Sequence, residues 1–142
     1  MIKVMFNPAI RVPFTKEYIE KIVRKISKKE KKITGSVEIN IVGDKEIKEL
    51  NSRYRGKNKV TDVLSFAWQE EKSAPSQDFL GQIYICFPRI VRQAKEFKVN
   101  VEEEFFRMLA HGLLHLAGYD HEEEKEAKKM FDLQEKILKS LI

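Results

Sequence analysis

The sequence has little cysteine and no long apolar run. Its 142 residues include a single cysteine, Cys86, so an intramolecular disulfide is excluded, as suits a reducing cytoplasm. Cys86 falls in an expected strand, which favours a small core residue over a nucleophile. No uninterrupted apolar stretch approaches the ~20 residues that span a membrane, and the N-terminus shows no secretory leader. We therefore expect a soluble, cytoplasmic protein with no membrane partner.

The sequence also lacks internal repeats, low-complexity tracts and a recognisable linker. Its length is ordinary for one domain and allows one substantial core. The apolar content of 42% is typical of a globular protein. These observations predict a single domain over residues 1–142.

Basic residues are in modest excess over acidic residues. Lysine and arginine number 27 against 22 aspartate and glutamate residues, a net charge of +5. This balance permits a nucleic-acid partner but does not establish one. The densest basic run is interpreted as a solvated helix face and loop. Its members are Lys21, Arg24, Lys25, Lys28, Lys29, Lys31 and Lys32.

Alternating and helical apolar spacings predict both strands and helices. Strands are expected over residues 2–6, 37–41 and 79–87 and from Val63 onward, with a polar loop over 69–78. Helices are expected after the capping residues Thr15, Asp44 and Asn100, over 89–97, and from Glu122. Elements of both kinds around one core make the fold class α+β.

All three histidines fall between Leu109 and His121. His111 and His115 stand four residues apart, which places both imidazoles on one face of a helix. Gly118 is the residue expected just past a helix end, where it would turn His121 back toward that face. Because imidazole is the commonest protein metal ligand, this arrangement indicates a metal site rather than chance packing histidines.

The number of ligands indicates the kind of metal site. Three imidazoles without an obvious fourth ligand are typical of a catalytic zinc site, since a structural site has four protein ligands. One Zn²⁺ per chain is predicted, although such a set also accepts nickel, cobalt, copper or iron. Zinc with an open position activates water or polarises a carbonyl or phosphoryl oxygen, so hydrolysis is the expected chemistry. The final helix is expected to pack across the outside of this site.

One residue separates the motif from that of a protease. The spacing His-x-x-x-His-x-x-Gly-x-x-His matches the metzincin pattern, but Gly112 stands where the protease has its catalytic glutamate. Peptide hydrolysis is therefore disfavoured, although another carboxylate such as Asp120 could take that role.

A phosphodiester makes a different demand on the site. Its negative charge grows toward the transition state, so a guanidinium near the metal is more useful than a carboxylate. A tight basic cluster supplies the candidates Arg53, Arg55, Lys57 and Lys59. On the residues alone, an ordinary exposed basic side chain is the simpler interpretation of each, and the tightness of the cluster only modestly favours a functional one.

Several motifs together resemble those of the bacterial YbeY endoribonuclease family, through most of the chain from residue 37 onward. They are Asn51, Tyr54-Arg-Gly-Lys57, Thr61-Asp-Val-Leu-Ser-Phe66, Leu80-Gly81, the histidine segment 111–121, Met130 and Glu135. Two positions depart from the family pattern. Val60 stands where proline is usual, and Gln82 where aspartate is usual.

The resemblance implies a fold, an activity and site residues. The fold is a mixed four-stranded sheet packed with helices, similar to the zincin-like metalloprotease catalytic domain. The activity is that of a single-strand-specific, metal-dependent endoribonuclease in 16S ribosomal RNA 3′-end maturation and ribosome quality control. Single-stranded RNA and ribosomal particles are the expected partners, and DNA is not. His111, His115 and His121 are implied as zinc ligands, and Arg55 and His111 as catalytic residues.

Two alternatives stay open. A zinc-dependent peptidase would use the same ligands on a different substrate. A non-catalytic RNA- or ribosome-binding module would bind RNA with salt-dependent affinity and turn over nothing.

Overall fold

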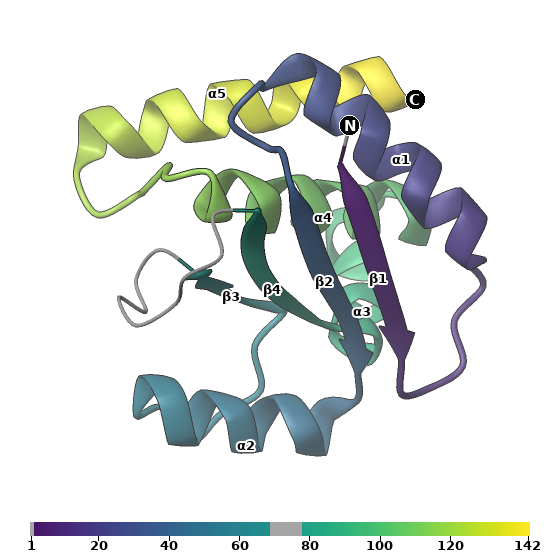
Figure 1. Ribbon diagram of the computed structural model, residues 1–142. Helices are drawn as coiled ribbons and strands as arrows, with labels where there is room; N and C mark the ends of the chain where they lie inside the picture. The colour runs from purple at the N-terminus through teal and green to yellow at the C-terminus, as the bar shows by residue number, and fades with distance from the viewer. Residues whose placement is uncertain (1, 69–77) are drawn as a thin grey trace.

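A computed structural model describes residues 2–68 and 78–142, with helices and strands around one mixed sheet (Figure 1). The strands are β1 (Lys3–Pro8), β2 (Ser36–Val42), β3 (Val63–Ala67) and β4 (Phe79–Cys86). The helices are α1 (Lys16–Lys29), α2 (Asp44–Arg55), α3 (Phe87–Phe97), α4 (Val101–Leu116) and α5 (Glu124–Leu141). None of the helices in the described residues is both long and apolar enough to cross a lipid bilayer.

The sheet has four strands in the order β1-β2-β4-β3. β1 pairs in parallel with β2, and β2 in parallel with β4. β3 runs antiparallel to β4. Because β3 comes last in the order, it forms an edge of the sheet, and it contacts the histidine helix α4. The predictions of an α+β fold and of a mixed four-stranded sheet are confirmed.

Helices cover both faces of this sheet. α1, α4 and α5 pack on one face over the main core, to which β2 contributes Val37, Ile39 and Ile41. In Figure 1, α1 and α5 lie side by side along the top and α2 lies along the bottom. The α2 side has a smaller apolar cluster that includes Cys86. Burial raises the pKa of the Cys86 thiol to about 11, as expected for a core residue and not for a nucleophile.

Two predicted strand ends differ in the structure. β1 continues to Pro8, because proline is tolerated in an edge strand. The strand predicted over 79–87 ends at Cys86, and α3 begins at Phe87 with Pro88 in its first turn, where the missing N–H of proline costs no hydrogen bond. Apart from Asp78, the predicted polar loop over 69–78 lies outside the described residues.

Two predicted helix starts also differ. Gly43, not Asp44, is the N-cap of α2. The Asp44 carboxylate instead accepts two hydrogen bonds from the Arg92 guanidinium of α3, at 3.0 and 3.1 Å. α5 begins at Glu124 rather than Glu122.

Candidate functional site

α4 carries the first two histidines on one face. Asn100 caps this helix, since its side chain accepts a hydrogen bond from the Glu103 backbone N–H at 2.7 Å, as predicted. His111 and His115 are half-buried, and their ring centroids lie 4.6 Å apart. The four-residue spacing therefore brings both imidazoles together.

The turn after α4 brings in the third histidine. Gly118 adopts a φ of +103°, in the left-handed region that favours glycine, and its N–H donates to the His115 carbonyl at 3.0 Å. The chain then returns, so that the His121 ring centroid lies 4.8 Å from that of His115 and 5.7 Å from that of His111. One ligand nitrogen of each histidine lies within 4.8 Å of the others.

A hydrogen bond from α5 fixes the His111 ring. The Gln134 amide nitrogen donates to the Glu135 carboxylate at 3.1 Å, so the amide oxygen is the atom that faces His111 Nδ1 at 2.7 Å. An amide oxygen only accepts, hence Nδ1 carries the proton and Nε2 the free lone pair. Arg107 holds Glu135 in turn, at 3.1 Å. The contact confirms that the final helix packs against the site.

His115 has the same tautomer for a similar reason. Its Nδ1 donates to the Tyr119 carbonyl at 3.0 Å, which leaves the lone pair on Nε2. Burial, together with the neighbouring imidazoles of His111 and His121, lowers the pKa of His115 to about 4. Burial also lowers the pKa of His111. Both rings are therefore neutral at pH 7, the form that binds a metal ion.

This donor set fits a zinc ion. Three imidazole nitrogens within reach of one point are a known catalytic ligand set, and a fourth coordination position stays open to substrate. Across residues 2–68 and 78–142, this is the one group of three or more His, Cys, Asp or Glu side chains close enough to share an ion.

The three histidines line a groove of about 630 Å³. Its walls come from the end of α2, the entry and edge of β3, and the turn after α4. Arg55 and Lys57 line the same groove, as do Asp62 and Asp120. Two cationic side chains and two carboxylates thus lie around the candidate metal centre.

Arg55 is held in this groove by two contacts with β3. One guanidinium nitrogen donates to the Ser65 carbonyl at 2.7 Å. The guanidinium carbon lies 4.9 Å from the centre of the Phe66 ring, a cation–π arrangement. A guanidinium has several N–H donors, so others remain for an anionic ligand. The side chain is thus anchored and still exposed.

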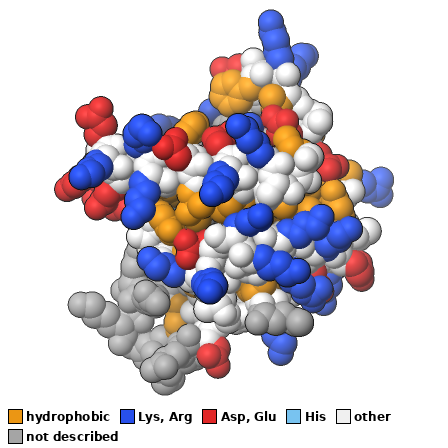
Figure 2. All heavy atoms as spheres, turned by 90° about the horizontal axis from the view of Figure 1, so that it is seen from above, with side chains coloured by type: hydrophobic (Ala, Val, Ile, Leu, Met, Phe, Trp, Pro, Cys, Tyr) orange, Lys and Arg blue, Asp and Glu red, His pale blue; other side chains and the backbone are white. Residues whose placement is uncertain are grey.

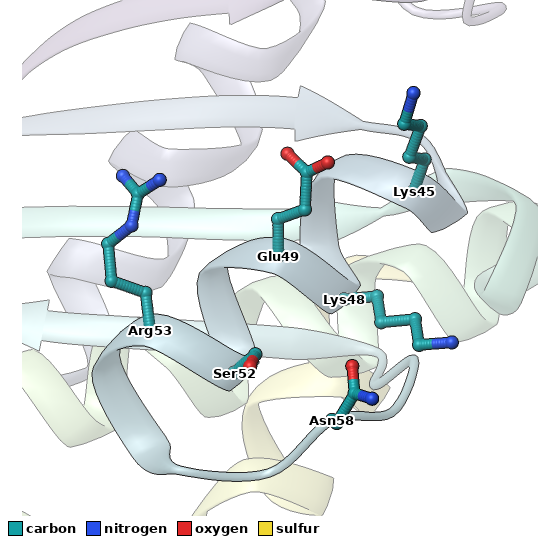
Figure 3. A pocket seen from close by; sticks show the side chains of 6 residues that line it. All are labelled: Lys45, Lys48, Glu49, Ser52, Arg53 and Asn58. Atoms are coloured by element: carbon teal, nitrogen blue, oxygen red, sulfur yellow. The ribbon is translucent and has the colours of Figure 1, made fainter.

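The basic cluster is divided between two surfaces. Lys57 joins Arg55 in the groove, whereas Arg53 lines a separate hollow of about 420 Å³ on α2. Figure 3 shows Arg53 directed to the same side of α2 as Glu49. Lys59 lines neither of these hollows in the part of the chain that the structure describes.

Gly112 is the point at which α4 touches the sheet. A Cβ at this position would lie 3.1 Å from two side-chain carbons of Ile83 and 3.2 Å from Ser65 Oγ, closer than such contacts normally come. A side chain at position 112 would therefore point at β3 and β4 and would push these two side chains back by a few tenths of an ångström. Asp120, the substitute base considered above, lines the groove and accepts from the His121 backbone N–H at 2.7 Å.

Two residues of the site were missed in the sequence. Asp62 lines the groove, and its negative charge partly offsets the lowering of the His111 pKa by burial. Gln134 is 2% exposed and contacts His111. The only signal for Gln134 was its spacing of four residues from Met130, which places both on the buried face of α5.

Comparisons with known proteins identify the family of this chain. A family model described as Endoribonuclease YbeY matches residues 7–142. A protein of that name from Thermodesulfovibrio yellowstonii is 48% identical over 106 residues, which cover 74% of this chain and 66% of that protein. Another from Persephonella marina is 41% identical over 142 residues, covering 98% and 89%. The solution structure of TM1509 from Thermotoga maritima is 34% identical with a TM-score of 0.65, covering 98% and 87%. This chain belongs to the Endoribonuclease YbeY family.

Proposed function

We propose that this protein is a zinc-dependent endoribonuclease that cleaves single-stranded RNA in the histidine groove. The observation that carries the proposal is the placement of three imidazoles and the Arg55 guanidinium in one groove. The family name supports RNA as the substrate. A guanidinium fixed beside a metal ion suits a phosphodiester, whose negative charge grows toward the transition state.

Each site residue has a distinct role in this proposal. His111, His115 and His121 hold one Zn²⁺, which when bound supplies a Lewis acid that polarises a phosphoryl oxygen. Arg55 binds a non-bridging oxygen of the scissile phosphate, where a charge-assisted hydrogen bond strengthens as charge develops. His111 is catalytic in that it contacts the ion, and Gln134 is a positioning residue that keeps its tautomer.

The size of the groove supports a single-stranded substrate. A volume of about 630 Å³ is that of a small-molecule pocket. It has room for a short stretch of one strand and too little for a duplex. Unpaired bases can turn out of the strand, which lets a phosphate approach the histidines.

The family resemblance extends the proposal to the substrate in the cell. We infer that the RNA is 16S ribosomal RNA, cleaved in the cytoplasm during 3′-end maturation and quality control of ribosomal particles. A net charge of +5 supports association with such polyanions.

A cleavage assay on single-stranded and duplex RNA, with and without EDTA, tests the proposal. We expect cleavage of the single strand, loss of cleavage with EDTA, and recovery when zinc is added back. Elemental analysis should give one zinc per chain, and none in a His111→Ala variant. Degradation of casein without RNA cleavage would favour the peptidase. RNA binding with no turnover in any metal would favour the binding module.

A further inference from the structure

The solvent face of α1 carries a row of lysines. Lys21, Lys25, Lys28 and Lys29 follow the i, i+4, i+7, i+8 spacing of one helix face, and all four are exposed. We call these four residues the α1 lysine stripe. Figure 2, which looks down on α1 and α5, shows Lys and Arg side chains gathered on this surface.

The stripe is not neutralised by the protein itself. Within residues 2–68 and 78–142, none of its four lysines forms an ion pair. Residues 21–32 hold seven basic residues and one acidic residue, a net charge of +6 that exceeds the +5 of the whole chain. Neighbouring α5 differs, because Lys128 pairs with Asp132 at 2.9 Å on its surface. The four lysines therefore repel one another, and a bound polyanion would relieve that repulsion.

The end of the stripe adjoins the histidine groove. Glu30 follows α1 and accepts a hydrogen bond from the Tyr119 hydroxyl, and the Lys32 ammonium lies 5.6 Å from the centre of the Tyr119 ring. A hollow of about 200 Å³ is lined by Lys32, Tyr119 and Lys129, together with the carboxylates of Asp120 and Glu126. It shares Tyr119 and its two chain neighbours with the groove. Lys32 and Lys129 therefore lie between α1 and the site, beside two carboxylates.

We propose that the α1 lysine stripe binds the phosphate backbone of the RNA that flanks the cleavage site. This inference rests on the proposed function, because it assumes that the strand in the groove is RNA. The strand leaves the groove past Tyr119 and Lys32 and continues along α1. The stripe has no exposed aromatic side chain on which bases could stack, so it reads charge and not sequence.

The α2 hollow is the rival surface. It is lined by Lys45, Lys48 and Arg53. Figure 3 shows Glu49 between Lys45 and Arg53 on the same side of the helix, which places a negative charge where a phosphate would lie. No acidic residue lies within the α1 stripe. Glu20 lies beside it and is paired with Lys16 and Arg24.

A triple variant Lys21→Gln, Lys25→Gln, Lys28→Gln tests the stripe, and Lys45→Gln, Lys48→Gln, Lys95→Gln is the control with the same charge change. Binding of labelled poly-uridine of about 30 nucleotides is measured on zinc-free protein at several salt concentrations. Three lost phosphate contacts should lower the slope of log Kd against log salt by about 2 and weaken binding roughly tenfold or more at ~0.1 M salt. The control should match the wild type. Cleavage of a uridine oligomer of about six nucleotides, which reaches the groove alone, should be unchanged in both variants.

Two results would overturn the proposal that the α1 lysine stripe binds RNA. One is a slope and Kd in the stripe variant equal to those of the wild type, and the other is an equal loss in the control. A failure of the proposed function looks different. In that case neither the wild type nor either variant cleaves the long or the short uridine RNA. The binding measurement on zinc-free protein still decides whether the stripe binds RNA.

Discussion

At His111 a single acceptor decides which ring nitrogen keeps its lone pair. The Gln134 amide oxygen accepts a hydrogen bond from the Nδ1–H at 2.7 Å. Its orientation depends on Glu135 and Arg107 behind it. Loss of such an outer hydrogen bond typically lowers the affinity of a site for its metal about 10- to 100-fold.

Substitution of Gln134 tests this link. Gln134→Ala should weaken zinc binding about 10- to 100-fold, because the His111 ring loses both its tautomer and its orientation. Gln134→Glu should keep tight binding, because a carboxylate also accepts from Nδ1. Competition with a chromophoric chelator measures both affinities. Equal zinc affinity in the alanine variant and the wild type would show that Gln134 only fills space.

The role of Arg55 can be tested by substitution. Arg55→Ala should reduce RNA cleavage about 100- to 1000-fold, as loss of a group that stabilises transition-state charge does, while one zinc per chain stays bound. Single-turnover rates with saturating RNA report the chemical step. Arg53→Ala is the matched control, since Arg53 lies on the same helix but lines the other hollow, and its rate should be unchanged. Undiminished cleavage by Arg55→Ala would remove Arg55 from the mechanism.

At the scale of elements, the turn between α4 and α5 shows what the sequence reveals and what it does not. The Asn100 cap, the two histidines on one face and the left-handed Gly118 were predictable, because caps, helical spacing and glycine depend on local chemistry. The Gln134 contact with His111 was not. It depends on the rotation of α5 against α4, which packing of the whole core decides.

The sheet likewise combines a predictable strand with an order of strands that was not predictable. Alternation of Val37, Ile39 and Ile41 predicted a strand, but the order β1-β2-β4-β3 arises from pairing between distant segments, which a local pattern does not specify. The Asp44 carboxylate shows the limit for single residues. Its position suggested a helix cap, yet the carboxylate binds Arg92, which only the approach of α3 to α2 makes possible.

That ion pair predicts a pH effect. The Arg92 guanidinium holds the pKa of Asp44 below its usual value, so the pair stabilises the fold above the unfolded pKa of about 3.9. That stabilisation is lost as the pH falls through the lower folded value. Arg92→Ala should cost about 0.2–1 kcal/mol at pH 7 and progressively less below pH ~4. Urea unfolding at pH 7 and pH 3 measures the difference.

Lys95→Ala is the control for this pair, since Lys95 is exposed on the same helix. It should be neutral at both pH values. A loss of stability in Arg92→Ala that is the same at pH 7 and pH 3 would assign the effect to lost packing and not to charge.

At the scale of the whole molecule, one sheet joins helices from both ends of the chain. α1 and α5 contact each other over the main core. A single domain over residues 1–142 stays a prediction, which a measurement of the cooperativity of unfolding can test.

Thermal unfolding supplies that measurement. We expect one transition, with equal calorimetric and van't Hoff enthalpies. Zinc should raise the Tm by several degrees, because a ligand at 100 times its Kd adds about 2.7 kcal/mol of stability. A His111→Ala, His115→Ala variant should show no rise. Two separate transitions in the metal-free protein would contradict the single domain, and a rise in the double variant would place the zinc elsewhere.

The close approach at Gly112 also limits how this protein could evolve. In a zincin, the residue after the first histidine decides whether the metal serves peptide hydrolysis. Here a Cβ at position 112 would crowd the side chains of Ile83 and Ser65, which would have to move back by a few tenths of an ångström. A change toward the protease motif would therefore have to be accommodated on β3 and β4 as well as on α4. We expect a glutamate at this position to be tolerated better when Ile83 is replaced by a smaller residue in the same chain.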